Sequence, residues 1–554
     1  MENKGNYWTG VWNRRLSRRQ ALRGVGKAGI GLAGLTLIGC AAPSAPAPTP
    51  KSTAPTPKPA GPTPTPAPTY GGTLIGAMNG SPAFDPGWHF GGSTDQTLYY
   101  LVYNSLLHEE PDSSLAPELA ESWEVPDPTT FVFKLKRGVK FHDGTDFNAT
   151  VAKAHYERLG DEGHKGPQAI ELRKSFKSAE ALDDYTYKMT IKTPNSSFLY
   201  QNTRSSGPGM IPQPYDAKKK NNDLKISGIG TGPFVADGWL MDERASVKKF
   251  SGYWEKGVPY LDAFVWRVVP SSDVQVTMLK TGEIQLIAVA QTKDLPVLKA
   301  DPNIVVAIKP GGKRKTIQFN MVNSPFKEKA IRQAVAYAID RVALTQAVWQ
   351  GLYTPGEGPF PPASWAYDPA QKGYPFDLAK AKEKMVEGGY PNGFEAKVSA
   401  ASSRPDEVTM SEVIKEMLAK IGIRLNIAVT SDANWTVIRN TDDKEHQLLA
   451  SSSGTADDPG NLIEVYYSSK MKIAMAKAKN PQLDSLLEKA QATYNQGEQK
   501  RYFQELGKLI TEDVWSILTI AYPVNIIAYR KNVHSIDVGL NYSSLFTRKT
   551  WLSK

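Results

Sequence analysis

Cysteine is almost absent from this chain of 554 residues, which limits the ways in which its fold can be stabilised. Cys40 is the single cysteine, so no disulfide can form within the chain and a hydrophobic core must supply the stability. The seven histidines form no HExxH or comparable pair, so we expect no metal and no other cofactor. A P-loop and a nucleophile elbow are also missing. Nothing selects a set of catalytic residues, and we expect a protein that is not an enzyme.

Long apolar runs are scarce as well. The stretch from Ala28 to Cys40 follows seven cations and ends in Leu37-Ile38-Gly39-Cys40. It is too short for a membrane-spanning helix, which needs about 20 apolar residues. The pattern is typical of a signal peptide that ends in a lipobox, where a peptidase cuts before the cysteine and the thiol then carries a lipid. We predict a signal peptide over residues 1–39 and lipidation at Cys40.

The basic part of this leader carries a second motif. Residues 17–23, SRRQALR, resemble a twin-arginine export signal, with Ala21 where phenylalanine is usual. An ordinary charged n-region of the general secretory route is the alternative. Both routes predict that the mature protein lies in the bacterial cell envelope, outside the cytoplasm and anchored to a membrane by its N-terminal lipid.

The net charge of +10 comes mostly from the leader. Residues 1–40 hold seven cations and one carboxylate, and the rest of the chain has a formal charge of +4. No dense basic stripe with interleaved aromatic residues remains. Nucleic acid is therefore not an expected partner.

Composition changes sharply at residue 70. Residues 41–69 hold eleven prolines and almost no large apolar side chain. Proline fixes φ and lacks an N–H group, so residues 40–69 are predicted to form a disordered, extended tether behind the lipidated cysteine.

From Tyr70 onward, strand and helix patterns alternate. Strand patterns occupy residues 72–78, 131–135, 185–191 and 265–270. Apolar residues follow helical spacing over residues 329–341, 412–421, 483–492 and 502–510. This alternation predicts an α/β body in which helices cover sheets, with two or three domains.

A series of short motifs occurs along this body in a fixed order. They are GGTL at 71–74, LAPELAESWE at 115–124, FKLKRGVKFHDGT at 133–145, GTGPF at 230–234, LKTGEI at 279–284, IRQA at 331–334, YAIDR at 337–341 and GGYPNGF at 388–394. In this order they resemble the extracytoplasmic solute-binding proteins of ABC importers, family 5, which includes dipeptide-, oligopeptide- and nickel-binding proteins. His142 is expected to be structural, and Arg332 and Asp340 to serve surface pairing or capping.

The resemblance implies a periplasmic-binding-protein-like fold. Such proteins have two lobes with a ligand cleft between them, a double hinge crossover, and an extra subdomain inserted in the N-terminal lobe. We expect lobe I over residues 70–97, 193–269 and 523–554, the inserted subdomain over 98–192, and lobe II over 270–522. The crossovers are expected near Pro270 and Pro523.

The resemblance also implies a function. A monomeric binding lipoprotein would capture a small solute, such as a peptide or sugar, and deliver it to ABC permease and ATPase subunits. The alternatives are a secreted lipoprotein hydrolase acting on glycans, and a binding-protein-like sensor or chaperone.

One family segment bears on the solute. In peptide-binding members, W-x-[AG]-D-x-x-x-P lines the cleft, and its aspartate holds the α-ammonium of the ligand. Residues 452–459 read SSGTADDP here, so Ser452 replaces the tryptophan and Thr455 replaces the aspartate. A neutral hydroxyl cannot supply that charge, which makes ordinary free-amine peptides poor candidates. Asp457 or Asp458 could compensate, or one of them could cap the helix that starts near Asn461.

Two further segments supply candidate ligand contacts. Trp88 and Phe90 follow the first strand and offer flat faces suited to sugars or aromatic groups, and Trp435 follows a later strand. Core packing or an interlobe contact is the alternative for these rings. The candidate ligand residues are Ser81, Trp88, Phe90, Trp435, Ser452, Ser453, Gly454, Thr455 and Asp457. Together they favour a peptide-like or oligosaccharide-like solute.

The lipobox generates a direct prediction. Cys40→Ser should abolish labelling of the protein by radioactive palmitate and leave unprocessed precursor, because serine cannot form the thioether. A Ser44→Ala variant in the tether serves as control and should be processed normally. Normal processing of the Cys40→Ser variant, with the protein still firmly membrane-bound, would contradict the lipoprotein assignment.

Overall fold

The computed structural model describes residues 67–78, 99–110, 114–203, 209, 211–212, 228–240, 242–322, 324–441, 445–454, 458–471, 473–476, 479–536 and 548–554. The predicted signal peptide, Cys40 and most of the tether lie outside these residues, as do Ser81, Trp88, Phe90, Thr455 and Asp457. Within the described ranges, no helix combines the length and the apolar character needed to cross a bilayer.

The first lobe is built on a seven-stranded sheet with the strand order β12-β19-β11-β1-β10-β9-β8. The strands are β1 (Thr73–Met78), β8 (Phe234–Leu240), β9 (Arg244–Lys249), β10 (Ala263–Val268), β11 (Leu286–Ile287), β12 (Ile304–Pro310) and β19 (Val524–Arg530). Strand β1 pairs in parallel with β10 and β11. Helices α5 (Ser272–Thr281) and α6 (Leu295–Ala300) pack on this sheet through Leu279 and Leu298, which join a buried cluster with Ile287 and Ile526.

This sheet corrects the predicted lobe boundary at residue 270. Val269 and Pro270 do end strand β10, but the chain then enters α5 and returns to the same sheet as β11 and β12. The first lobe therefore extends to Pro310. A strand that ends at a proline does not reveal which sheet the next strand joins, and this is why the sequence placed the crossover too early.

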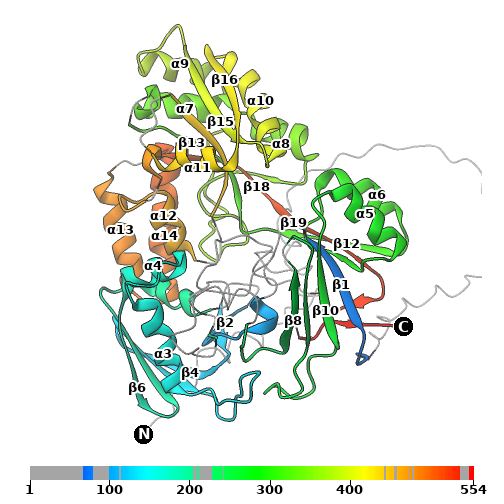
Figure 1. The fold of residues 1–554 in the computed structure, drawn as a ribbon. Coiled ribbons are helices and arrows are strands. Elements are labelled where there is room, and N and C mark those ends of the chain that lie inside the picture. Colours follow the sequence, from blue (N-terminus) through cyan, green and yellow to red (C-terminus); the bar gives the residue numbers. More distant parts are fainter. Residues whose placement is uncertain are drawn as a thin grey trace, which may run out of the picture. The chain divides into compact units, whose positions relative to one another are not determined.

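The two lobes are joined by a continuous antiparallel ribbon, which we call the hinge ribbon (residues 304–319 and 517–530). Pro310 lies opposite Val524 in the first sheet, and Lys315 lies opposite Ala521 in the second. Between them, the N–H of Gly311 donates to the carbonyl of Pro523 at 3.0 Å. A Cβ on Gly311 would lie 3.0 Å from that carbonyl oxygen. Glycine at position 311 therefore allows the two segments of the ribbon to approach closely. Figure 1 shows β18 leading directly into β19.

The second lobe contains a six-stranded sheet with the order β14-β18-β13-β17-β15-β16. Its strands are β13 (Arg314–Phe319), β14 (Thr354–Pro355), β15 (Phe394–Ala401), β16 (Ile423–Thr430), β17 (Leu448–Ser453) and β18 (Ile517–Tyr522). Its helices are α7 (Lys329–Ala338), α8 (Arg341–Trp349), α9 (Leu378–Glu387), α10 (Pro405–Ala419), α11 (Asp432–Asn440), α12 (Pro459–Tyr466), α13 (Pro481–Ala492) and α14 (Gln496–Asp513).

Alternation along the central strands sends side chains to two separate cores. Leu448 and Ala450 join the cluster formed with α7 to α10, while Leu449 joins the cluster formed with α11 to α14. Successive strand residues point to opposite faces, so the sheet is sandwiched between two helical layers (Figure 1).

The inserted subdomain has a four-stranded antiparallel sheet with the order β4-β5-β7-β6. Its elements are β4 (Ala120–Asp127), β5 (Thr130–Leu135), α3 (Ala149–Gly160), α4 (Pro167–Ser175), β6 (Phe176–Asp183) and β7 (Thr186–Ile191). The remaining short elements are β2 (Leu107–Glu109), β3 (Leu115–Pro117), β20 (Val533–His534), β21 (Trp551–Leu552), η3 (Ser196–Phe198), η4 (Tyr200–Asn202), η6 (Thr292–Asp294), η7 (Pro325–Lys327) and η8 (Ala474–Ala476). Phe131, Phe133 and Tyr187 of the sheet pack against Tyr156 of α3 to form the subdomain core.

Family motif residues have structural partners. The ring of His142 lies between the N–H of Gly230 and the carbonyl of Gly232, and burial lowers its pKa to about 4. Asp340 caps α8 by accepting from the N–H of Ala343 at 2.9 Å. The surface role expected for Arg332 is wrong. Its guanidinium is buried and donates to the carbonyls of Phe326, Lys327, Asp513 and Val514.

Three hydrogen bonds connect the region around the inserted subdomain with the second lobe. Ser197 of η3 donates to a carboxylate oxygen of Asp458 at 2.7 Å, and Gln499 of α14 donates to Ser196 at 2.6 Å. The hydroxyl of Tyr494 donates to the carbonyl of Pro128 at 3.0 Å. Asp458 also caps α12 through the N–H of Asn461, which confirms the capping alternative for this residue. Burial raises the pKa of Asp458 to about 7.

Arg332 is expected to be essential for stability. Arg332→Met should lower the free energy of unfolding by about 3 kcal/mol, because four carbonyls lose a buried, charged donor. Urea unfolding monitored by circular dichroism measures the loss. Lys382→Met, at an exposed position of α9, is the control and should change stability by less than about 0.5 kcal/mol. Equal stability of both variants would contradict the structural role of Arg332.

Asp458 is expected to make stability depend on pH. Its pKa is higher in the folded protein than its ordinary value of 3.8, so the stabilisation is fully present below about pH 4 and is lost as the pH rises through about 7. Asp458→Asn keeps the cap but cannot ionise, so the variant should exceed the parent by a few kcal/mol at pH 8.5 and match it at pH 4. Urea titrations at both pH values measure the difference. Asp377→Asn, the accessible cap of α9, is the control, and a D458N difference independent of pH would contradict the assignment.

Candidate ligand-binding site

The second sheet has one edge at which several strands end together. Strand β15 is parallel to both β16 and β17, so their carboxyl ends, at Ala401, Thr430 and Ser453, lie at the same edge. Arg314, the first residue of β13, lies opposite Ser453 and places the hinge ribbon at this edge as well. Open α/β sheets bind ligands outside the carboxyl ends of their strands. We therefore take this carboxyl edge as the candidate site.

Three helices begin at the carboxyl edge, one after each of these strands. Helix α10 follows β15 and starts at Pro405, α11 follows β16, and α12 follows β17. The caps of α11 and α12 are Ser431, which accepts from the N–H of Asn434, and Asp458. Helix N-termini carry a partial positive charge, so the backbone alone makes this edge favourable for anions.

Charged side chains gather around the start of α10. Lys315 pairs with Asp406 at 2.6 Å and with Glu407 at 3.4 Å. Arg404 pairs with Asp432 at 3.2 Å and with Glu407 at 3.7 Å. Glu407 therefore pairs with both cations, whereas Asp406 and Asp432 each pair with one.

Lys313 adds a further cation beside this cluster. It forms no ion pair with any residue that the structure describes. Burial lowers the pKa of its ammonium, and the neighbouring charges of Lys315 and Arg404 lower it further. Three cations, Lys313, Lys315 and Arg404, therefore lie beside three carboxylates around the start of α10.

The structure places three predicted ligand residues at the end of β17. The hydroxyl of Ser452 donates to Glu407 at 2.7 Å. Ser453 lies opposite Arg314, with its hydroxyl 3.5 Å from a terminal guanidinium nitrogen. Gly454 has a φ of +82° and donates its N–H to the hydroxyl of Tyr466. Both serine hydroxyls thus contact protein groups.

Trp435 is at the same edge but its ring is not available for stacking. It is 6% exposed, and its indole N–H donates to the carbonyl of Ala450 at 3.1 Å. The guanidinium of Arg404 lies 4.4 Å from the ring centre. The expectation that a solute stacks on Trp435 is therefore corrected, because protein groups already occupy the ring.

The sequence interpretation missed the arginines of this edge. Arg314 lies in the run Lys313-Arg314-Lys315, directly before a strand, and this was a signal that could have been used. Arg314 is fully buried, and its guanidinium donates to the hydroxyl of Tyr467 at 2.6 Å. Arg439, on α11, carried no comparable signal in the sequence.

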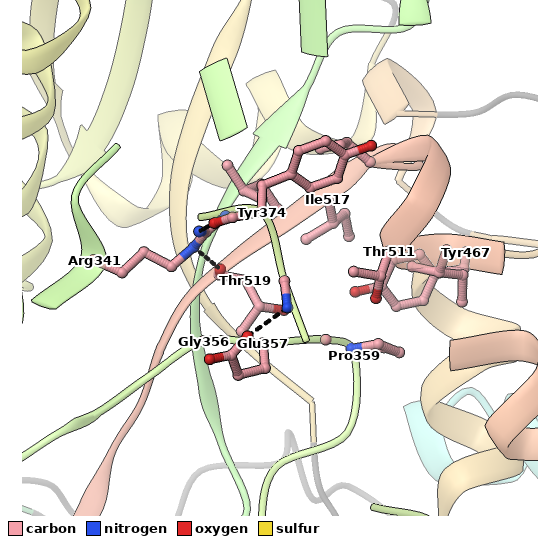
Figure 2. Close-up of a pocket in the computed structure, with 14 residues that line it drawn as sticks. Arg341, Gly356, Glu357, Pro359, Tyr374, Tyr467, Thr511, Ile517 and Thr519 are labelled. Carbon is pink, nitrogen blue, oxygen red and sulfur yellow. Dashed lines mark hydrogen bonds between the residues drawn. The ribbon is translucent and has the colours of Figure 1, made fainter. Parts of the chain in front are cut away.

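A small cavity in the second lobe is lined in part by Tyr467 (Figure 2). Arg341 donates to the carbonyls of Thr519 and Tyr374 at its wall, and the carboxylate of Glu357 accepts from the N–H of Gly373. Its volume of about 20 Å³ has room for about one water molecule. The cavity is too small for a solute, so it does not compete with the carboxyl edge as a candidate site.

Among the described residues, no three histidine, cysteine or carboxylate side chains are grouped so that they could hold a metal ion.

Comparison with known proteins agrees with this architecture. Residues 114–472 match the family model described as "Bacterial extracellular solute-binding proteins, family 5 Middle". The glutathione-binding protein GsiB of Escherichia coli (strain K12) is 30% identical over 461 residues, which cover 81% of this chain and 89% of that protein.

Solved structures of binding proteins are similar to this chain as well. DppA from Helicobacter pylori, in complex with the peptide STSA, is 27% identical with a TM-score of 0.75, over 88% of this chain and 99% of that one. AgaA, in complex with agropinic acid, from A. tumefaciens R10, is 27% identical with a TM-score of 0.74, over 87% and 99%. These relatives are binding proteins, in agreement with the expectation that the chain is not an enzyme. The chain therefore belongs to family 5 of the bacterial extracellular solute-binding proteins, which serve ABC importers.

Proposed function

We propose that this protein is a lipid-anchored monomer that captures a peptide-like or oligosaccharide-like solute and delivers it to the permease and ATPase subunits of an ABC importer. The observation that carries the proposal is the carboxyl edge of the second sheet, which abuts the hinge ribbon. A solute bound there would contact the second lobe beside the segment about which the lobes move.

Capture follows from an equilibrium between open and closed arrangements of the two lobes. A solute that contacts both lobes stabilises the closed arrangement by its differential affinity for the two states. The contacts of Ser197 with Asp458 and of Ser196 with Gln499 are the kind of interlobe bonds that closure would form or tighten. The proline-rich segment 40–69 would act as the tether that joins this body to the membrane.

The class of solute follows from the charges at the edge. Relatives are named for glutathione or were solved with the peptide STSA and with agropinic acid. This chain departs from the peptide-binding pattern, since Thr455 stands where an aspartate holds the ligand ammonium. The neighbouring carboxylates Asp406, Glu407 and Asp432 pair with protein cations. We therefore propose that ordinary free-amine peptides bind poorly.

Calorimetry with a peptide panel tests this proposal. Unmodified dipeptides and tripeptides should bind at least about 100-fold more weakly than the native solute, because burying an ammonium without a carboxylate partner costs several kcal/mol. Thr455→Asp should create weak peptide binding, and the matched neutral variant Thr455→Asn should not. Sub-micromolar binding of ordinary peptides by the unmutated protein, lost when the peptide amine is acetylated, would contradict the proposal.

A further inference from the structure

Three arginines and three aromatic rings alternate along the carboxyl edge, and we call this set the arginine–aromatic ladder. The contacts, from guanidinium carbon to ring centre, are Arg404 to Trp435 at 4.4 Å, Arg439 to Trp435 at 5.8 Å, Arg439 to Tyr466 at 5.9 Å, Arg314 to Tyr466 at 5.4 Å and Arg314 to Tyr467 at 5.4 Å. Each lies within the range of cation–π attraction. The ladder draws on β13, α11, α12 and the residues just before α10, so the tertiary fold alone brings it together.

The charges along the ladder are not balanced. Arg404, at one end, pairs with Asp432 and Glu407. Arg314 and Arg439 have no ion pair with any residue in the described ranges. Cation–π contacts and hydroxyl partners do not replace a counter-charge for a buried guanidinium. Two of the three cations therefore have no anionic partner in the part of the chain that the structure describes.

Hydrogen bonding shows the same deficit. The Nε atoms of Arg314 and Arg439 are both buried and have no hydrogen-bond partner among the described residues. Arg314 is fully buried, while its terminal nitrogens reach only Tyr467 and, at 3.5 Å, Ser453. Buried donors are nearly always satisfied in folded proteins, so two buried, unpaired Nε donors beside one tyrosine indicate that a partner is missing.

The ladder lies directly beside the segment that the family resemblance assigns to the ligand. Tyr466, between the two unpaired arginines, accepts from the N–H of Gly454 at 3.1 Å. A Cβ on Gly454 would lie 3.0 Å from a terminal nitrogen of Arg314. Arg314 therefore lies directly against the end of β17, and Arg439, in the last turn of α11, reaches the same tyrosine.

We propose that Arg314 and Arg439 bind an acidic group of the solute. This inference rests on the proposed function and deepens it, by giving the solute a charge. A carboxylate fits best, because a guanidinium presents paired N–H donors in a planar fork that matches the two carboxylate oxygens. The site thus recognises the acidic group of the solute. Thr455, at the position of the family aspartate, supplies no carboxylate that could bind an ammonium.

Matched probes separate the charge from the rest of the solute. N-acetyl-trialanine is compared with its C-terminal amide, and trigalacturonate with its trimethyl ester, by calorimetry and thermal shift on the full chain. Phosphoserine with its amine acetylated distinguishes a phosphate from a carboxylate site. Small molecules released from the purified protein on denaturation are identified by mass spectrometry. We expect the released solute to carry a carboxylate, and acid probes to bind at least 10-fold more tightly than their neutral partners.

Variants assign the effect to the ladder. Arg314→Gln and Arg439→Gln should each weaken binding of the released solute at least 10-fold, and Arg314→Lys should lose less than Arg314→Gln because it keeps the charge. Arg137→Gln is the matched control, since its guanidinium lies 4.2 Å from the ring centre of Tyr185 in the inserted subdomain. It should bind as the parent does. Circular dichroism checks that each variant is folded, and the lysine variant remains decisive if a glutamine variant unfolds.

The outcomes separate this inference from the proposed function. A tightly bound solute without an acidic group, or acid binding unchanged in both glutamine variants, overturns the role of Arg314 and Arg439 but leaves a solute-binding protein. Tighter binding of the phosphoserine probe than of both carboxylates overturns the carboxylate assignment. A purified protein that releases no small molecule and binds none of the probes contradicts both proposals.

Discussion

The hinge ribbon is the constraint on which the rest of the structure depends. Strands β12 and β19 are neighbours in one sheet, and β13 and β18 are neighbours in the other, so both connections between the lobes run side by side. Any movement of the lobes must bend these two segments together at Gly311 and Pro523. The same geometry places Arg314 and Lys315 at the start of β13, a few residues after Gly311. The carboxyl ends of β15, β16 and β17 lie at the same edge of the second sheet.

The carboxyl edge combines two sources of positive charge. The N-termini of α10, α11 and α12 contribute the backbone part, and the arginine–aromatic ladder contributes side chains whose charges are only partly neutralised. The familiar peptide-binding arrangement has a carboxylate at the position of Thr455. Loss of that carboxylate and the presence of unpaired guanidinium groups change the site in the same direction, away from a cationic end of the solute and toward an anionic one.

The sequence predicted the family, the α/β class and many elements, because ordered motifs and apolar periodicity are local properties. The strand at 72–78 and the helices at 483–492 and 502–510 agree with β1, α13 and α14. It misplaced the first crossover, since sheet membership is not local. The sequence interpretation also placed Arg332 at the surface, because helical spacing cannot show that its guanidinium donates to four carbonyls. The ladder was out of reach, because Arg314, Arg439 and Tyr466 meet only through tertiary packing.

Hydrogen–deuterium exchange of the full chain, with and without the solute released from the purified protein, tests the central claim most directly. If the carboxyl edge is the binding site, adding the solute should slow exchange in peptides that cover residues 431–440 and 448–454 and the hinge ribbon. The outer helices α13 and α14 should change little by comparison. Protection confined to those outer helices, with residues 431–440 and 448–454 unchanged, would contradict the account.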